Sequence, residues 1–191
     1  MVFQDKSRDY NHAPLFSKRA PNNDTFTRDI CDTCGFIDYV NPKIVAGVVA
    51  LWESKILMCR RDIEPRKGFW TLPAGFMEQL ETTQQGAARE AKEEACADVD
   101  IGPLLAIYNV ERISQVQIFY RGDLRSPDIA AGDETVEVAL LDWEEIPWAE
   151  LAFPSVYWAL KYFHETRDME NFPPAPQPED WLATPGFKYT G

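Results

Sequence analysis

Three glutamates in the stretch REAKEE, residues 89–94, constrain this chain more than any other feature. Residues 83–95 are rich in Ala, Glu and Gln and therefore predict a helix. At about 100° per residue, Glu90, Glu93 and Glu94 share roughly a third of its circumference. The adjoining face carries four alanines, Ala87, Ala88, Ala91 and Ala95. Like charges at this spacing repel one another, so we expect a cation beside them, and the alanines allow close packing against a sheet.

The helix alone leaves two interpretations open. A hard divalent ion such as Mg²⁺ or Mn²⁺ binds carboxylate oxygens, keeps several waters and bridges to substrate phosphates. The alternative is a solvent-exposed acidic face that pairs with Arg89 and Lys92. The residues that precede the helix favour the first interpretation.

A longer pattern begins at Gly75. Five residues separate Gly75 from Glu81, and seven more separate Glu81 from REAKEE. This spacing resembles the Nudix box, with Ala91 at its aliphatic position and Cys96 in place of its late glycine. In the family that glycine has a positive φ, which costs another residue about 1 kcal/mol. We expect a reshaped helix end at Cys96, with every charged position of the box retained.

The resemblance implies hydrolysis of a nucleoside diphosphate linked to another moiety. By position, Arg89 and Glu81 would form the ion pair that orients the site. The implied metal ligands are Glu90, Glu93 and Glu94, with a backbone carbonyl near Ala74 or Gly75. Divalent ions neutralise the diphosphate and lower the pKa of a bound water.

The residue that accepts the water's proton is left open by the pattern. Glu94 and Glu90 are the candidates within the box. In some family members a later loop supplies the base, and Glu134 in the stretch AGDETVEV occupies such a loop, with Glu137 as a second candidate. An exposed turn residue is the alternative interpretation of Glu134.

Strand-like runs before and after the helix predict the rest of the fold. Residues 43–61 read as a β-hairpin, and strands are expected near residues 104–110, 116–121 and 136–141. A second helix is expected at about 155–166, with Ser155 as its cap. This order predicts an α/β fold, in which helices sandwich a mixed sheet, and the resemblance implies the Nudix α/β/α sandwich. The predicted segments are a degenerate zinc-ribbon-like appendage (1–40), a Nudix domain (41–168) and a proline-rich tail (169–191).

Charge and hydropathy exclude several partners. The net charge is −12, from 19 basic and 31 acidic residues, which disfavours nucleic acid binding. The longest apolar run, residues 44–52, is too short to cross a bilayer. The first residues resemble neither a signal nor a transit peptide, so we expect a cytoplasmic protein without a membrane partner.

The segments around the box resemble a Nudix subgroup that has an N-terminal zinc ribbon and ADP-ribose or FAD pyrophosphatase activity. A structural Zn²⁺ needs four ligands, and Cys31 and Cys34 are the candidate ligands here. His12 is a conceivable third ligand, while Cys59 and Cys96 lie in a predicted strand and at the helix end. We therefore expect a ribbon remnant without zinc, with bound Zn²⁺ as the alternative.

Aromatic and amide side chains are candidates for binding the organic ends of the substrate. Flat rings gain about 1–3 kcal/mol by stacking on bases. The candidates are Phe76, Tyr108, Phe119 and Tyr120 for stacking, and Gln115 and Gln117 for hydrogen bonding; core packing is the alternative for each ring. The predicted reaction cleaves ADP-ribose or FAD to AMP and a second monophosphate. Hydrolysis of NADH or a nucleoside triphosphate and a nucleotide sensor are the alternatives, and a homodimer is expected.

Overall fold

The computed structural model describes residues 15–179 and 184–185 and contains two compact units, Met1–Asn41 and Pro42–Gly191. In the first unit, three short antiparallel strands form a sheet in the order β1-β2-β3. They are β1 (Phe16–Arg19), β2 (Arg28–Cys31) and β3 (Ile37–Asp38).

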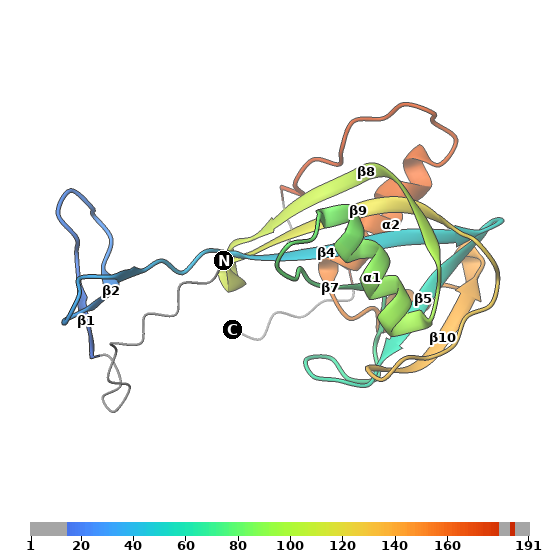
Figure 1. Ribbon diagram of the computed structural model, residues 1–191. Helices are drawn as coiled ribbons and strands as arrows, with labels where there is room; N and C mark the ends of the chain where they lie inside the picture. The colour runs from blue at the N-terminus through green and yellow to red at the C-terminus, as the bar shows by residue number, and fades with distance from the viewer. Residues whose placement is uncertain (1–14, 180–183, 186–191) are drawn as a thin grey trace. The chain divides into compact units, whose positions relative to one another are not determined.

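The second unit is built on a mixed sheet in the order β10-β5-β4-β9-β8, in which β6 pairs with β5 and β7 with β4. Only β4 and β9 are parallel among these named pairs. The strands are β4 (Lys43–Trp52), β5 (Lys55–Arg61), β6 (Trp70–Thr71), β7 (Ala74–Phe76), β8 (Val99–Val110), β9 (Gln115–Leu124) and β10 (Thr135–Leu141). Helices α1 (Thr83–Ala95) and α2 (Pro154–Thr166) cover opposite faces, so the predicted sandwich is confirmed (Figure 1). Three single-turn 3₁₀ helices, Glu111–Ile113, Trp143–Glu145 and Trp148–Glu150, complete the elements.

Helix α1 begins and packs as its sequence predicts. The Thr82 hydroxyl accepts a hydrogen bond from the backbone N–H of Gln85, whose side chain accepts from the N–H of Thr82 in return. Such capping typically contributes about 1 kcal/mol. Three of the four alanines, Ala87, Ala91 and Ala95, are fully buried in one cluster with Ala46, Val48 and Ala50 of β4, whereas Ala88 is half-buried. Small side chains on both surfaces therefore bring α1 close to the sheet.

Helix α2 closes the other face over a larger apolar core. The cluster beneath it includes Tyr108, Phe119, Leu105, Val156, Leu160 and Phe163. The predicted Ser155 cap is wrong: the helix has Phe153 at its N-cap and Pro154 in its first turn, and Ser155 is buried within the helix. Proline suits this position because its φ is already helical and its missing N–H has no partner there.

Part of the tail lies along the edge strand β8. The N–H of Ala175 donates to the carbonyl of Leu105 (2.8 Å), and the N–H of Asn109 donates to the Gln177 side chain (2.8 Å). These contacts satisfy backbone groups that an open edge would leave for other chains. Among the described residues, no helix has the length and apolar character needed to cross a membrane.

Candidate active site

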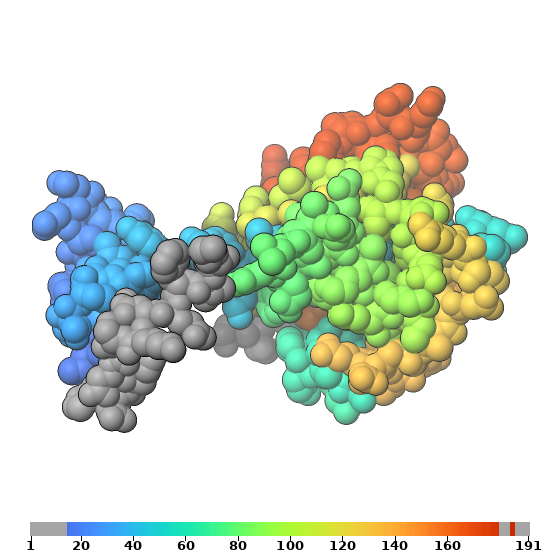
Figure 2. Space-filling model, in the orientation of Figure 1, coloured from blue at the N-terminus to red at the C-terminus, as the bar shows by residue number. Residues whose placement is uncertain are grey.

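A cavity of about 900 Å³ opens where the ends of β4, β7 and β9 meet the C-terminal half of α1. Its carboxylate side is formed by Glu90, Glu93, Glu94 and Glu134, and its apolar side includes Phe76, Phe119 and Phe153. Segments distant in sequence complete the wall: the turquoise segment after β5 lies beside the yellow-orange segment that precedes β10 (Figure 2). The N–H of Asp62 donates to the carbonyl of Glu134 across this junction (2.8 Å).

The leading glycine of the box is required by contact with α1. A Cβ built on Gly75 would lie 2.3–2.5 Å from the carboxylate atoms of Glu90. A side chain at position 75 would displace this carboxylate, so glycine at position 75 lets Glu90 keep its place beside β7. Glu90 and Glu94 are nearly buried, with 8% and 7% of their surface exposed, whereas Glu93 is exposed.

Arg89 organises three of the carboxylates. Its guanidinium donates to both oxygens of Glu81, at 3.0 and 2.8 Å, in the bidentate geometry that makes arginine–carboxylate pairs strong. Its Nη1 atom donates to Glu90 and Glu93, at 2.8 Å each, and Nη2 to the carbonyl of Phe76 at 3.0 Å. The hydrogen bonding of its side chain to the Glu81 carboxylate is the largest cause of the raised Arg89 pKa. The ion pair implied by the resemblance is thus present and joins α1 to the loop after β7.

Burial dominates the electrostatics of the inner carboxylates. Desolvation raises the pKa of Glu94 to about 8, although the N–H of Ala74 donates to its Oε2 atom at 3.1 Å. Desolvation also raises the pKa of Glu90. The nearby carboxylate of Glu134 acts in the same direction on both groups. The site therefore holds less positive charge than its carboxylates require when all are ionised.

Backbone hydrogen bonds fix the segment that carries Glu134. The N–H groups of Ala130 and Gly132 donate to the last carbonyls of α1, those of Ala95 (3.0 Å) and Glu94 (3.1 Å). A Cβ on Gly132 would lie 1.7 Å from the carbonyl oxygen of Glu93, so only glycine permits this approach. The carboxylate of Glu134 is consequently held at the same cavity as the glutamates of α1, as the sequence predicted for a later loop.

The fit of a divalent ion can be judged from the donors present. Three carboxylates at one cavity match the preference of Mg²⁺ and Mn²⁺ for oxygen, and because burial raises the pKa of Glu90 and Glu94, a bound cation would favour their ionised forms. Within the described ranges, however, no three His, Cys, Asp or Glu side chains are already grouped to hold a metal. The reason is visible in the contacts, because Glu90 and Glu93 both accept hydrogen bonds from Arg89. These residues therefore fit a divalent ion if Glu90 and Glu93 release Arg89 and bind the ion in its place.

Arg61 is a site residue that the sequence interpretation missed. Only 9% of its surface is exposed, its Nε atom donates to the carbonyl of Pro65 (2.9 Å), and its guanidinium lies 5.2 Å from the Phe153 ring centre. It lines the same cavity as Glu94, and its positive charge acts to lower the pKa of that carboxyl, but none of the described carboxylates lies within salt-bridge distance of it. The neighbouring Arg60 is instead a surface residue that pairs with Glu137 at 3.3 Å. Strand alternation separates the two arginines, but only the fold shows which one faces the cavity.

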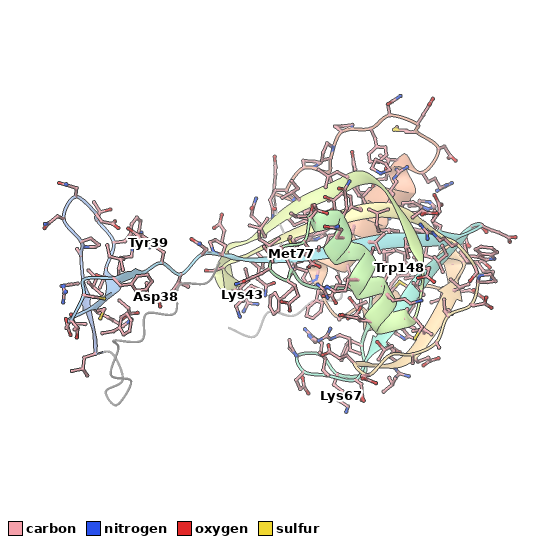
Figure 3. The ribbon with its side chains drawn as sticks, viewed as in Figure 1. Asp38, Tyr39, Lys43, Lys67, Met77 and Trp148 are labelled. Atoms are coloured by element: carbon pink, nitrogen blue, oxygen red, sulfur yellow. The ribbon has the colours of Figure 1, made fainter. Side chains whose placement is uncertain are left out.

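The predicted substrate-binding residues separate into two groups. Phe76, Gln115, Gln117 and Phe119 line the cavity. The Gln117 amide donates to Gln115 (3.0 Å), and Lys43, labelled at the start of β4 in Figure 3, lies 4.9 Å from the Phe76 ring centre. Phe76, Gln115 and Gln117 form a polar and aromatic surface beside the carboxylates, whereas Phe119 is 2% exposed and belongs mainly to the core beneath α2.

Tyr108 and Tyr120 do not belong to this surface, which corrects the prediction. Tyr108 is 1% exposed and packs against Phe119 and Trp158 in the core under α2. Tyr120 is buried on the α1 face, where its hydroxyl is hydrogen-bonded to that of Thr83 (2.5 Å). Alternation along β8 and β9 was visible in the sequence, but the depth of each ring depends on the helices that cover it.

Cys96 adopts the conformation that the family's glycine would have. Its φ and ψ are 52° and 18°, its N–H donates to the carbonyl of Lys92 (3.0 Å), and the next N–H, that of Ala97, donates to the carbonyl of Ala91 (3.2 Å), so the helix end is not reshaped as predicted. We expect Cys96→Gly to increase the free energy of unfolding by about 0.5–1 kcal/mol, because it removes the left-handed strain. Urea denaturation of Cys96→Gly and of Cys96→Ala, which keeps a Cβ, tests this: equal stability of the two variants would contradict it.

The N-terminal unit brings together only part of a zinc site. Cys31 and Cys34 share the turn between β2 and β3, whereas Cys59 is buried in β5 and Cys96 lies at the end of α1. His12 lies outside the described residues.

Comparison with known proteins shows the family of the chain. The model of the NUDIX domain matches residues 41–165, and the chain therefore belongs to the Nudix family; it is a Nudix pyrophosphatase. It is 30% identical over 119 residues to an ADP-ribose pyrophosphatase of Methanocaldococcus jannaschii, covering 60% of this chain and 69% of that protein.

Solved structures agree on the fold. A NUDIX hydrolase from Nitrosomonas europaea has a TM-score of 0.81 and 44% identity, covering 87% of this chain and 93% of that one. An ADP-ribose pyrophosphatase from Streptococcus suis has a TM-score of 0.60 and 22% identity, covering 70% and 98% of the two chains, which supports the fold alone.

Proposed function

We propose that this protein hydrolyses the diphosphate linkage of ADP-ribose, or of FAD, to AMP and the other monophosphate in the presence of Mg²⁺ or Mn²⁺. The observation that carries the proposal is that Arg89, Glu90, Glu93 and Glu94 of the box line one cavity, while Glu81 holds Arg89 in place. The same cavity contains Phe76, Gln115 and Gln117, side chains suited to a base or another flat ring. The Methanocaldococcus jannaschii relative supports ADP-ribose as the first substrate to test.

The residues of the chain have distinct roles in this proposal. Glu90, Glu93 and Glu94 would hold the divalent ion, with the backbone carbonyl of Ala74 or Gly75 assisting. When bound, the ion supplies charge neutralisation at the diphosphate and a water of lowered pKa. Arg89 and Glu81 orient the loop and helix that carry these groups, as their bidentate contact indicates.

Two carboxylates are candidates for accepting the proton of the attacking water. Glu94 is buried beside β7, and Glu134 is exposed on the segment fixed to the end of α1. A general base must lie within hydrogen-bonding reach of the water it activates. We place Glu134 first for this step, because it lines the cavity on a segment fixed to the end of α1 and the box does not assign it to the ion.

Arg61 provides charge for the phosphate groups from the wall of the same cavity. Its guanidinium is buried and forms no salt bridge among the described residues, although its charge acts on Glu94, so an incoming diphosphate would supply a direct counter-charge. We expect Arg61→Gln to raise the KM for ADP-ribose by about 10- to 100-fold, the usual range for a lost charged hydrogen bond. Steady-state kinetics with Mg²⁺ would measure this change.

The adjacent arginine gives a matched control. Arg60→Gln removes the same charge from the same strand, but at an exposed ion pair, and should change KM less than about twofold. Arg61→Lys, which keeps the charge, separates a binding defect from a folding defect if thermal unfolding is recorded alongside. Equal KM changes in Arg60→Gln and Arg61→Gln would contradict a phosphate-binding role for Arg61.

The substrate proposal is tested by comparing ADP-ribose, FAD, NADH and a nucleoside triphosphate with Mg²⁺ or Mn²⁺ and identifying products by chromatography. AMP and the matching monophosphate from ADP-ribose or FAD would support it. Preference for the triphosphate would favour the alternative of nucleotide house-cleaning. Tight binding of ADP-ribose without turnover would favour a nucleotide sensor.

Three further expectations belong to the same proposal. We propose a homodimer, a cytoplasmic location and an N-terminal ribbon remnant without zinc. Sedimentation analysis of the full chain tests the first, cell fractionation the second, and metal analysis of the purified protein the third. For zinc, the expected content is less than one ion per chain.

A further inference from the structure

The turn between β2 and β3 contains a pair of cysteines that the hydrolase site does not use. Cys31 and Cys34 are three residues apart in the sequence CDTCG. The N–H of Gly35 donates to the carbonyl of Cys31 (2.9 Å), and the N–H of Cys31 donates to the carbonyl of Phe36 (2.8 Å). Gly35 has a φ of 74°, which closes the turn. The backbone thus holds both cysteines on one short, fixed turn.

The two thiols differ in access but contact each other. Cys34 is exposed, whereas Cys31 is 4% exposed, and neither forms a disulfide in this structure. The sulfur of Cys31 faces the N–H groups of Cys34 and Thr33 and also the thiol of Cys34. The N–H of Cys34 is the largest cause of the lowered pKa of the Cys31 thiol. A thiolate at Cys31 is therefore stabilised directly beside an accessible sulfur.

A metal does not account for the pair within the part of the chain that the structure describes. Structural zinc takes four ligands, and no third His, Cys, Asp or Glu of the described residues joins these two. Two neighbouring thiols without further ligands have the arrangement of a dithiol that can exchange with disulfides.

We propose that Cys31 and Cys34 form a redox-active dithiol, which a low-molecular-weight disulfide such as oxidised glutathione converts to an intramolecular disulfide. The exposed Cys34, as its thiolate, attacks one sulfur of oxidised glutathione, forming a mixed disulfide and releasing one glutathione thiolate. The Cys31 thiolate then attacks the Cys34 sulfur, forming the Cys31–Cys34 bond and releasing the second glutathione thiolate. The cysteines lose two electrons and two protons, and the two glutathione molecules gain them as thiols.

Glutathione redox buffers applied to the full-length protein test this inference. After acid quenching and alkylation, mass spectrometry reads the tryptic peptide of residues 29–43, which contains both cysteines. We expect this peptide to change from a doubly alkylated form to an unalkylated form two hydrogens lighter than the free dithiol. Added reducing agent should reverse the change.

The chain provides its own controls. Cys96 is an exposed thiol on another tryptic peptide and should accumulate only a glutathione adduct, whereas the buried Cys59 should remain alkylatable only after unfolding. In Cys31→Ser, the reaction at Cys34 should likewise end at the glutathione adduct, because the second thiol is missing. A persistent adduct on Cys34 of the wild-type protein, or no change in the peptide, would overturn the proposal. Stoichiometric zinc that is lost in Cys31→Ser would also overturn it, in favour of a metal site.

Discussion

Replacement of Glu94 by glutamine should lower the turnover of ADP-ribose with Mg²⁺ by more than about 100-fold while leaving the fold intact. The variant loses the charge of a proposed metal ligand, but its amide oxygen can still accept the hydrogen bond from the N–H of Ala74. Initial rates over a range of Mg²⁺ concentrations, together with circular dichroism, measure the two effects separately.

Glu165→Gln is the matched control for this prediction, because it makes the same chemical change at an exposed position of α2. Its turnover should equal that of the wild-type protein. Wild-type turnover in Glu94→Gln would remove the assignment of Glu94 as a metal ligand. If the wild-type protein itself leaves every tested substrate intact, the substrate proposal fails instead. The wild-type rate therefore distinguishes a wrong substrate from a wrong metal ligand.

Without a divalent ion, the stability of the wild-type protein should decrease as pH rises from about 5 to 8. Burial raises the pKa of Glu94 from 4.5 to about 8, so the folded state keeps a proton that the unfolded chain releases. The stability that protonated Glu94 contributes is therefore fully present below its pKa in the unfolded chain. It is lost as the pH rises through its pKa in the folded state. The raised pKa of Glu90 acts in the same direction. We expect the free energy of unfolding to be lower at pH 9 than at pH 5 by on the order of 3 kcal/mol.

Urea denaturation in EDTA across this range measures the effect, and Glu94→Gln isolates it. The variant has no carboxyl to ionise at position 94, so its stability should change less with pH and should exceed that of the wild-type protein at pH 9. Other titrating groups, such as His164, are common to both proteins and cancel in the difference. Parallel profiles would contradict the buried-carboxylate account. Excess Mg²⁺ should reduce the wild-type loss, since an ion that binds only the folded state stabilises it.

The sequence by itself determined the central helix, its charge pattern and the class of reaction. Residues 83–95 predict a helix, and the observed α1 has those bounds. The spacing of the glutamates within REAKEE depends only on local geometry, because positions three and four residues apart share one helix face. The hairpin over residues 43–61 is also a local property, and it appears as β4 and β5.

Tertiary structure decided which side chains surround the helix. Alternation places Arg60 and Arg61 on opposite faces of β5, but which face borders the cavity depends on how β10 and the loops pack. Tyr108 and Gln117 are directly paired across β8 and β9, yet one is buried under α2 and the other reaches the cavity. The pKa of Glu94 likewise follows from burial by residues distant in sequence. The local sequence determines the periodicity and spacing of side chains. How deeply a side chain is buried, the dielectric environment around it and its neighbours from distant segments are determined only when the helices pack on the sheet.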